Sequence, residues 1–144
     1  MGTRNEGIAS SGGAVDARDL AVWAIGSAWT LVAAFARTVR SHRERIAIES
    51  GHARLTYAQL DAASDTLAAT IAGFGSSAAD RVAVLMPHDL PQIVAMLGVL
   101  KAGRIVVVLD PGHPEARLRA IVEDAAPCLV MADAAHGALA DRVA

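Results

Sequence analysis

Three short runs of apolar residues recur at a fixed interval in the second half of the chain. VAVLM (82–86), IVVVL (105–109) and CLVMA (128–132) begin 23 residues apart, and each gap is long enough for one helix and its turns. Strands that are apolar on both faces and alternate with amphipathic helices are typical of a parallel sheet covered on both sides. The sequence therefore predicts an α/β fold, a partial doubly wound parallel sheet of βαβαβ order.

Both gaps contain the residues that begin and end helices. The first predicts a helix that is capped by Asp89, has Pro91 in its first turn and ends at Gly103. In the second, Pro114 starts a helix and Glu115 favours its positive end. The apolar stripe of the first helix is Ile93, Met96, Leu97 and Leu100, and the inward side of the second is Leu118, Ile121 and Val122.

A hairpin and a further helix are expected before this sheet. Two strand-like runs, residues 46–50 and 53–57, flank Gly51 and His52. Thr56 stands three residues before Gln59, which is the spacing of a capping box at a helix start. The helix has apolar residues at three- and four-residue steps, and glycines that tolerate a left-handed backbone follow it. These residues are Leu60, Ala63, Leu67 and Ile71, then Gly73 and Gly75.

The N-terminal region divides into a tail and an apolar segment. Residues 1–18 contain several Gly and Ser residues and no hydrophobic periodicity, and they are expected to be a flexible tail. Residues 20–36 carry no charge, but they are shorter than the roughly 20 strongly apolar residues of a membrane span. We expect a buried or surface-docked helix there, at the start of a domain that covers residues 19–144.

Composition narrows the class of protein. With 144 residues, 53% of them hydrophobic, and a net charge of −2, the chain suits one folded domain rather than a disordered segment. Thirteen basic against 15 acidic residues leave no overall positive field for binding nucleic acid, but these totals do not exclude a local basic patch. A single cysteine excludes an internal disulfide and a cysteine-based zinc site, so a cytoplasmic location is expected.

Motifs of nucleotide or hydrolase chemistry are missing. Residues 98–105 have the GxxxxG spacing of a phosphate loop, but Arg104 and Ile105 stand where that loop has Lys and Ser/Thr. The segment also joins a predicted helix to a strand, whereas a phosphate loop joins a strand to a helix. There is no GxGxxG after a strand and no GxSxG. Cys128 is interpreted as an inert strand residue. The histidines lack metal-pair spacing and are expected in loops and caps; they are His42, His52, His88, His113 and His136.

One polar cluster lies where ligands bind in open α/β sheets. DPGHPEAR (110–117) follows a strand and precedes a helix start, and Asp110 ends the strand. The same residues would make a plain turn and helix start, which is the favoured reading. A receiver-like phosphoacceptor role for Asp110 is a third reading, but no acidic pair follows residues 82–86 and the only lysine is Lys101.

Two stretches resemble a known family. LTYAQLD (55–61) resembles the first core motif of the adenylate-forming, AMP-binding superfamily, especially adenylation domains of nonribosomal peptide synthetases. LKAGRIVVVLDPGHPEARL (100–118) is similar to the second motif. The resemblance runs from about residue 31 to residue 133. It departs where the family strand carries an aromatic residue and a proline; Val106 and Val108 stand there, and we interpret them as packing changes in a buried strand.

The resemblance implies a function for a larger unit. Members of the family use ATP and Mg²⁺ to convert a carboxylic acid into an acyl-AMP, and then pass it to a thiol. Their phosphate loop, adenine motif, ribose-binding Asp and C-terminal Lys lie later than the part resembled here. We therefore expect no catalytic, cofactor-binding or metal-binding residue in this chain, and no adenylation by the chain alone. Expected partners are the remaining part of an adenylation domain, a synthetase, a carrier protein or a second copy. The alternative is a non-catalytic scaffold or docking module derived from that family.

Overall fold

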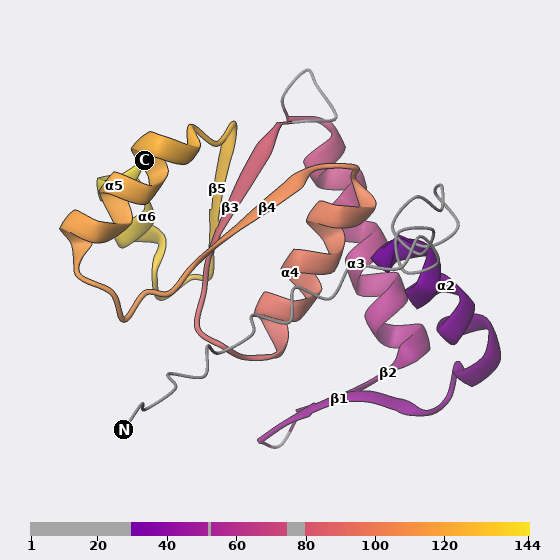
Figure 1. Cartoon of the computed structure of the whole chain (residues 1–144). Coiled ribbons are helices and arrows are strands. Elements are labelled where there is room, and N and C mark those ends of the chain that lie inside the picture. Colours follow the sequence, from indigo (N-terminus) through magenta and orange to yellow (C-terminus); the bar gives the residue numbers. More distant parts are fainter. Residues whose placement is uncertain (1–29, 52, 75–79) are drawn as a thin grey trace, which may run out of the picture.

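The described chain consists of a hairpin with helices beside it and a parallel sheet with helices on both faces (Figure 1). The computed structural model describes residues 30–51, 53–74 and 80–144. The expected tail (1–18), residues 20–29 of the apolar segment, His52 and Gly75 lie outside these residues. In chain order the elements are α2 (Leu31–His42), β1 (Ile46–Ser50), β2 (Ala53–Thr56), α3 (Tyr57–Ala72), β3 (Arg81–Leu85), α4 (Leu90–Lys101), β4 (Ile105–Leu109), α5 (Glu115–Ala125), β5 (Leu129–Ala132) and α6 (Gly137–Val143).

The three apolar runs form one parallel sheet in the order β4-β3-β5, so the predicted α/β fold is confirmed. β3 lies in the centre, and its residues from Val82 to Leu85 are fully buried because helices cover both of its faces. The two N-terminal runs pair as the expected antiparallel hairpin, β1 with β2. No helix among the described residues is long and apolar enough to cross a membrane.

The edge strand β4 differs from the expectation of burial on both faces. Ile105 is 46% exposed and Val108 is 40% exposed, because β4 has a strand neighbour on one side only among the described residues. Val106 packs against the buried core, as expected of a packing change in a buried strand. Val108 does not, so that interpretation is wrong for Val108.

The sheet has one hydrophobic core on each face, and successive side chains of β3 point into them alternately. α3 and α4 close one core, which contains Val82 and Val84 of β3. α5 and α6 close the other core, which contains Ala83 and Leu85. Because successive strand residues point to opposite faces, β3 contributes to both cores and makes this a doubly wound arrangement.

Both the start of α3 and the place where it ends follow the sequence prediction, but the backbone at its end is not left-handed. The Thr56 hydroxyl accepts a hydrogen bond from the Gln59 N–H at 3.2 Å, and the Gln59 side chain accepts one from the Thr56 N–H at 2.9 Å. This is the expected capping box. Gly73 follows the last helical residue with φ −74°, which is right-handed. The left-handed helix end expected at Gly73 is therefore absent.

The stripe predicted for α4 does not face the sheet. Ala95 and Val99, which are not part of the predicted stripe, pack toward the sheet. The predicted stripe of Ile93, Met96, Leu97 and Leu100 lies along an apolar cleft shared with α2, α3 and β1. The tertiary arrangement thus gives α4 two apolar faces where the sequence pattern indicates one stripe.

Candidate functional site

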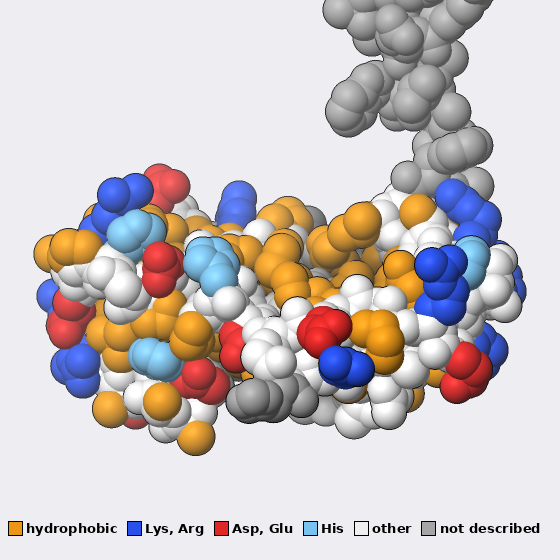
Figure 2. Space-filling model, turned by 90° about the horizontal axis from the view of Figure 1, so that it is seen from below, with side chains coloured by type: hydrophobic (Ala, Val, Ile, Leu, Met, Phe, Trp, Pro, Cys, Tyr) orange, Lys and Arg blue, Asp and Glu red, His pale blue; other side chains and the backbone are white. Residues whose placement is uncertain are grey.

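The carboxyl ends of the three parallel strands are level with one another. Leu85 of β3 is paired with Leu109 of β4 and with Ala132 of β5, so the segments that follow these residues leave the sheet at one edge. Figure 2 views the molecule from below Figure 1, toward this edge, and shows His and acidic side chains gathered over the sheet end. In open α/β sheets this edge is where ligands bind.

Asp110 forms a turn at this edge. Its carboxylate Oδ1 accepts a hydrogen bond from the Gly112 N–H at 2.8 Å, and its backbone oxygen accepts one from the His113 N–H at 3.0 Å. The receiver-like reading would need Asp110 to close a central strand, but β4 lies at the edge of the sheet formed by the described residues. The Asp110 carboxylate is engaged by its own loop, which favours the turn interpretation over a ligand site.

The loop after β3 is held by a buried glutamine. Gln92 is 3% exposed; its amide nitrogen donates to the Met86 carbonyl at 2.9 Å, and its oxygen lies 2.9 Å from His88 Nδ1. Asp89 caps α4 as expected, because its carboxylate accepts from the Leu90 N–H at 2.6 Å. The Ser50 hydroxyl and this N–H hold the pKa of the Asp89 carboxyl below its ordinary value.

The loop after β5 contains a second acidic group. Asp133 Oδ1 lies 2.6 Å from His136 Nδ1 and 3.0 Å from the His136 backbone nitrogen. These hydrogen bonds from His136, the side chain first, hold the pKa of the Asp133 carboxyl below its ordinary value. Asp89 and Asp133 are therefore ionised at neutral pH, and they give this edge a negative charge.

This donor set does not fit a nucleotide triphosphate or its metal. A triphosphate needs clustered cations or free N–H groups, whereas carboxylates are prominent at the edge. Among residues 30–51, 53–74 and 80–144, no group of three or more His, Cys, Asp and Glu could hold a metal ion. No step of an adenylation reaction can be assigned to this edge.

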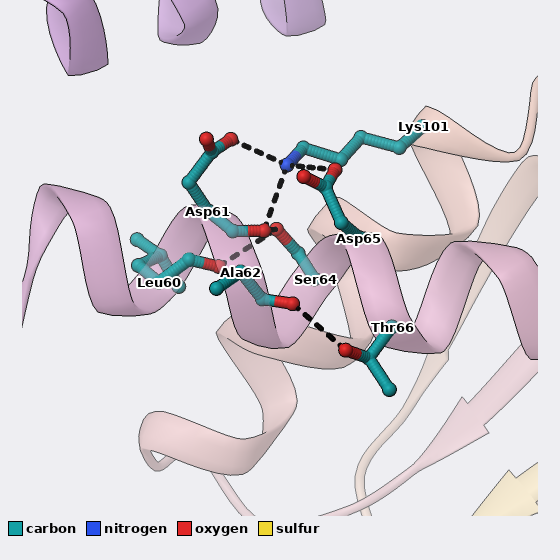
Figure 3. Close-up of polar contacts among 7 residues, drawn as sticks. All are labelled: Leu60, Asp61, Ala62, Ser64, Asp65, Thr66 and Lys101. Atoms are coloured by element: carbon teal, nitrogen blue, oxygen red, sulfur yellow. Dashed lines mark hydrogen bonds and ion pairs between the residues drawn. The ribbon is translucent and has the colours of Figure 1, made fainter.

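Lys101 belongs to a polar cluster on the helical side of the sheet (Figure 3). Its Nζ donates to Asp61 Oδ1 and to Asp65 Oδ1, each at 2.7 Å, and to the Asp61 carbonyl at 3.1 Å. It also lies 5.3 Å from the centre of the Phe35 ring. With its side chain only 10% exposed and its three N–H donors used, Lys101 links α3 to α4.

The structure places the other residues singled out in the sequence as follows. Gly98 lies inside α4 and Gly103 lies between α4 and β4, so the GxxxxG spacing does not form a phosphate loop. His88 and His113 lie in loops and His136 caps α6, as expected, whereas His42 is the last helical residue of α2, before the cap at Arg43. β5 begins at Leu129, so Cys128 lies just before the strand, and it is exposed. The interpretation of Cys128 as a residue of a buried strand is therefore wrong.

An apolar cleft lies between α2, α3, α4 and the hairpin, and the predicted stripe of α4 forms only one of its walls. The cleft has a volume of about 330 Å³. Its walls come from segments far apart in sequence, so hydrophobic periodicity within one helix could not reveal it. The lining residues are Leu31, Phe35, Ala47, Ile48, Tyr57, Leu60, Ile93, Met96, Leu97 and Leu100.

Sequence comparison identifies relatives of this fold. Residues 35–144 match the family model described as AMP-binding enzyme. The chain is 32% identical over 136 residues to the probable non-canonical nonribosomal peptide synthetase CymA of Salinispora arenicola, covering 92% of this chain and 2% of that protein. It is 37% identical over 102 residues to syringomycin synthase SyrB1 of Pseudomonas syringae pv. syringae, covering 71% of this chain and 17% of that protein. The chain thus spans a small part of the length of these relatives.

Solved structures share the fold. VinN aligns with a TM-score of 0.71 and 26% identity, over 78% of this chain and 30% of VinN. The fatty acid AMP ligase from Legionella pneumophila aligns with a TM-score of 0.65 and 30% identity, over 74% of this chain and 20% of the ligase. The similarity therefore extends across most of the present chain and a minor part of each larger structure.

Proposed function

Because the chain belongs to the AMP-binding enzyme family, we propose that it forms the N-terminal portion of an adenylation domain of the nonribosomal peptide synthetase type. The proposed portion covers residues 19–144. The complete domain would use ATP and Mg²⁺ to activate a carboxylic or amino acid as an acyl-AMP. The similarity to synthetases such as CymA and SyrB1 supports the choice of this branch of the family.

The observation that carries the proposal is a contact between the two resembled motifs. Asp61 closes LTYAQLD, Lys101 lies near the start of the second motif, and their side chains meet at 2.7 Å. Thr56 and Gln59 of the first motif cap α3, while Asp110 of the second shapes the turn after β4. The motif residues therefore position helices and strands, which is the role expected of a scaffold portion.

In this proposal, catalysis requires groups outside the described residues. The edge of the sheet is lined by ionised carboxylates, which repel the phosphates of ATP. We therefore propose that the 144-residue chain does not adenylate alone and that the remaining part of an adenylation domain supplies the groups that bind ATP and Mg²⁺. In this proposal the chain works in the cytoplasm, and its partners are that remaining part and, through it, a synthetase or carrier protein.

Substrate-dependent exchange between ATP and pyrophosphate tests this function. The chain alone, with ATP, Mg²⁺ and a panel of amino and carboxylic acids, should give no exchange. Adding a polypeptide that carries the remaining part of an adenylation domain should restore exchange with one class of acid. A Leu85→Asp variant is the matched control, because a charge at this fully buried position prevents folding and should abolish restoration.

The outcomes separate the two functional classes. Exchange at enzymatic rates by the chain alone would contradict the scaffold assignment. A stable complex that gives no exchange with any acid would instead support the non-catalytic docking module. Tight ATP binding measured by calorimetry would count against that module.

A further inference from the structure

The apolar cleft between α2, α3, α4 and the hairpin is open to solvent. Ile93 on α4 is 38% exposed and Leu31, the first residue of α2, is 63% exposed, so large apolar side chains of the cleft remain in water. On its wall the rings of Phe35 and Tyr57 lie 6.3 Å apart. No charged side chain of the described residues lines the cleft. It is therefore suited to an uncharged segment with large apolar side chains.

The sequence that precedes α2 has the matching chemistry. Residues 20–29, the N-terminal apolar segment, carry no charge. They include both tryptophans of the chain, Trp23 and Trp29, together with Leu20, Val22 and Ile25. Tryptophan has a large apolar ring and often acts as an anchor in an apolar pocket. The segment therefore gains most free energy where apolar side chains cover these rings.

The N-terminal apolar segment joins the described chain at the mouth of the cleft. Thr30 caps α2, because its hydroxyl accepts a hydrogen bond from the Ala33 N–H at 3.2 Å, and its backbone is extended with φ −63° and ψ 156°. The chain therefore leaves the line of α2 at Thr30, and the next residue, Leu31, lines the cleft. Such a short connection gives the segment an effective concentration of about millimolar at the cleft. A separate molecule must first lose translational and rotational freedom that the attached segment has already lost.

We propose that the N-terminal apolar segment docks as a helix in this cleft of its own chain. In a helix, Val22, Ile25 and Trp29 share one face, because they are three and four residues apart. A helix from Val22 to Trp29 is about 10 Å long, and so is the α4 wall from Ile93 to Leu100. Docking removes the exposed side chains of the cleft from water. The inference does not depend on the proposed function.

Tryptophan fluorescence of the full chain tests this docking. Because Trp23 and Trp29 are the only tryptophans, the emission reports on the N-terminal apolar segment alone. The folded chain should emit at a shorter wavelength than the urea-unfolded chain, and acrylamide should quench it less. Both properties should be independent of protein concentration, because the contact lies within one chain.

Two substitutions separate docking in this cleft from burial at another place. Ile93→Glu puts a charge on the exposed wall of the cleft, and Leu31→Asp puts one at its mouth, where a negative charge favours the start of α2. Each should shift the emission to the wavelength of the unfolded chain and increase quenching by acrylamide. Val108→Glu is the matched control, because Val108 is similarly exposed but does not line the cleft, and its emission should equal that of the parent. Circular dichroism verifies that the three variants are folded.

Three outcomes would overturn the proposal. Emission of the folded parent at the wavelength of the unfolded chain would show that the segment stays in water. A short-wavelength emission that survives both Ile93→Glu and Leu31→Asp would place the segment outside this cleft. A shift that appears only as the protein concentration rises would assign the cleft to the segment of a second copy. These measurements need no ATP, acid substrate or further polypeptide, so the failure of this proposal and of the proposed function are distinguishable.

Discussion

The ammonium group of Lys101 joins residues that are forty positions apart in sequence. It is shielded between α3 and α4, where Asp61 and Asp65 lie one helical turn apart and both accept its hydrogen bonds. Charge-assisted hydrogen bonds are stronger when they are shielded from water. A single side chain therefore fixes how the first resembled motif lies against the second.

Replacing Lys101 tests this link. Lys101→Met keeps the length of the apolar stem but leaves Asp61 without its cation, and it should lower the free energy of unfolding by about 1–3 kcal/mol. Arg54→Ala is the control, because the Arg54–Glu49 pair is largely exposed and should contribute at most about 1 kcal/mol. Urea unfolding measures both values. Equal losses in the two variants would contradict the assigned role of Lys101.

Glu115 gives the stability a predictable pH dependence. A hydrogen bond from Arg142 is the main cause that holds the pKa of the Glu115 carboxyl below the ordinary value of 4.5. Since the folded-state pKa is the lower one, the stabilisation is present above pH 4.5 and is lost as the pH falls through the folded-state pKa. Glu115→Gln should therefore be less stable than the parent at pH 7 and should match it in acid.

Unfolding of the parent and the variant across this pH range provides the measurement. Glu123→Gln is a matched control on the same helix, because Glu123 is exposed and forms no ion pair with the other described residues. Its difference from the parent should not follow the same pH profile. A Glu115→Gln difference that persists unchanged in acid would refute the assignment.

At the scale of elements, α3 and α4 approach closely at Gly98. A Cβ atom added at Gly98 would lie 3.0 Å from the Cβ, Cγ and Cδ2 atoms of Leu67. That is closer than ordinary van der Waals contact, so any larger residue at this position requires Leu67 or the helices to shift. The sequence shows a glycine within an apolar helix but not the neighbour that requires it.

Gly98→Ala should therefore destabilise the chain although alanine favours helices. Crowding of Leu67 should cost about 1–3 kcal/mol, which exceeds the gain of up to about 1 kcal/mol in helix propensity. Gly137→Ala in α6 is the control: nothing lies within 4 Å of its added Cβ, so it should be neutral or stabilising. Thermal unfolding measures both, and adding Leu67→Ala to Gly98→Ala should recover part of the loss attributed to crowding.

At the scale of the whole molecule, β3 couples the two faces of the sheet. Val84 belongs to the core closed by α3 and α4, while Leu85 belongs to the core closed by α5 and α6. Neither core can lose its packing without exposing residues of the same central strand. The sheet and its four helices should consequently unfold as one cooperative unit.

Native-state hydrogen exchange tests this coupling. Slowly exchanging amides of β3, α4 and α5 should report the same free energy of opening, and Val84→Ala should lower all three values together. The expected decrease is about 1–3 kcal/mol, because the substitution removes a buried branched side chain. An opening of α5 and α6 that leaves β3 and α4 protected would show that the two faces unfold separately.

The sequence alone determined the local parts of this protein. The capping box of Thr56 and Gln59, the cap at Asp89 and the three apolar strands depend on residues near one another in the chain, so their patterns predicted the elements and the α/β class. The same locality explains why the turn at Asp110 could be predicted. The two resembled motifs also indicated the family, because their order and spacing are properties of the chain itself.

Only the tertiary structure decided which surfaces these elements share. The order β4-β3-β5 leaves Val108 exposed, and the pairing of Lys101 with Asp61 and the apolar cleft bring together distant segments. Hydrophobic periodicity shows which side of an element avoids water, but it does not specify the neighbour that covers that side. Packing of the whole chain selects those neighbours. It decides which apolar residues are buried, as in β3, and which stay exposed, as Val108 does.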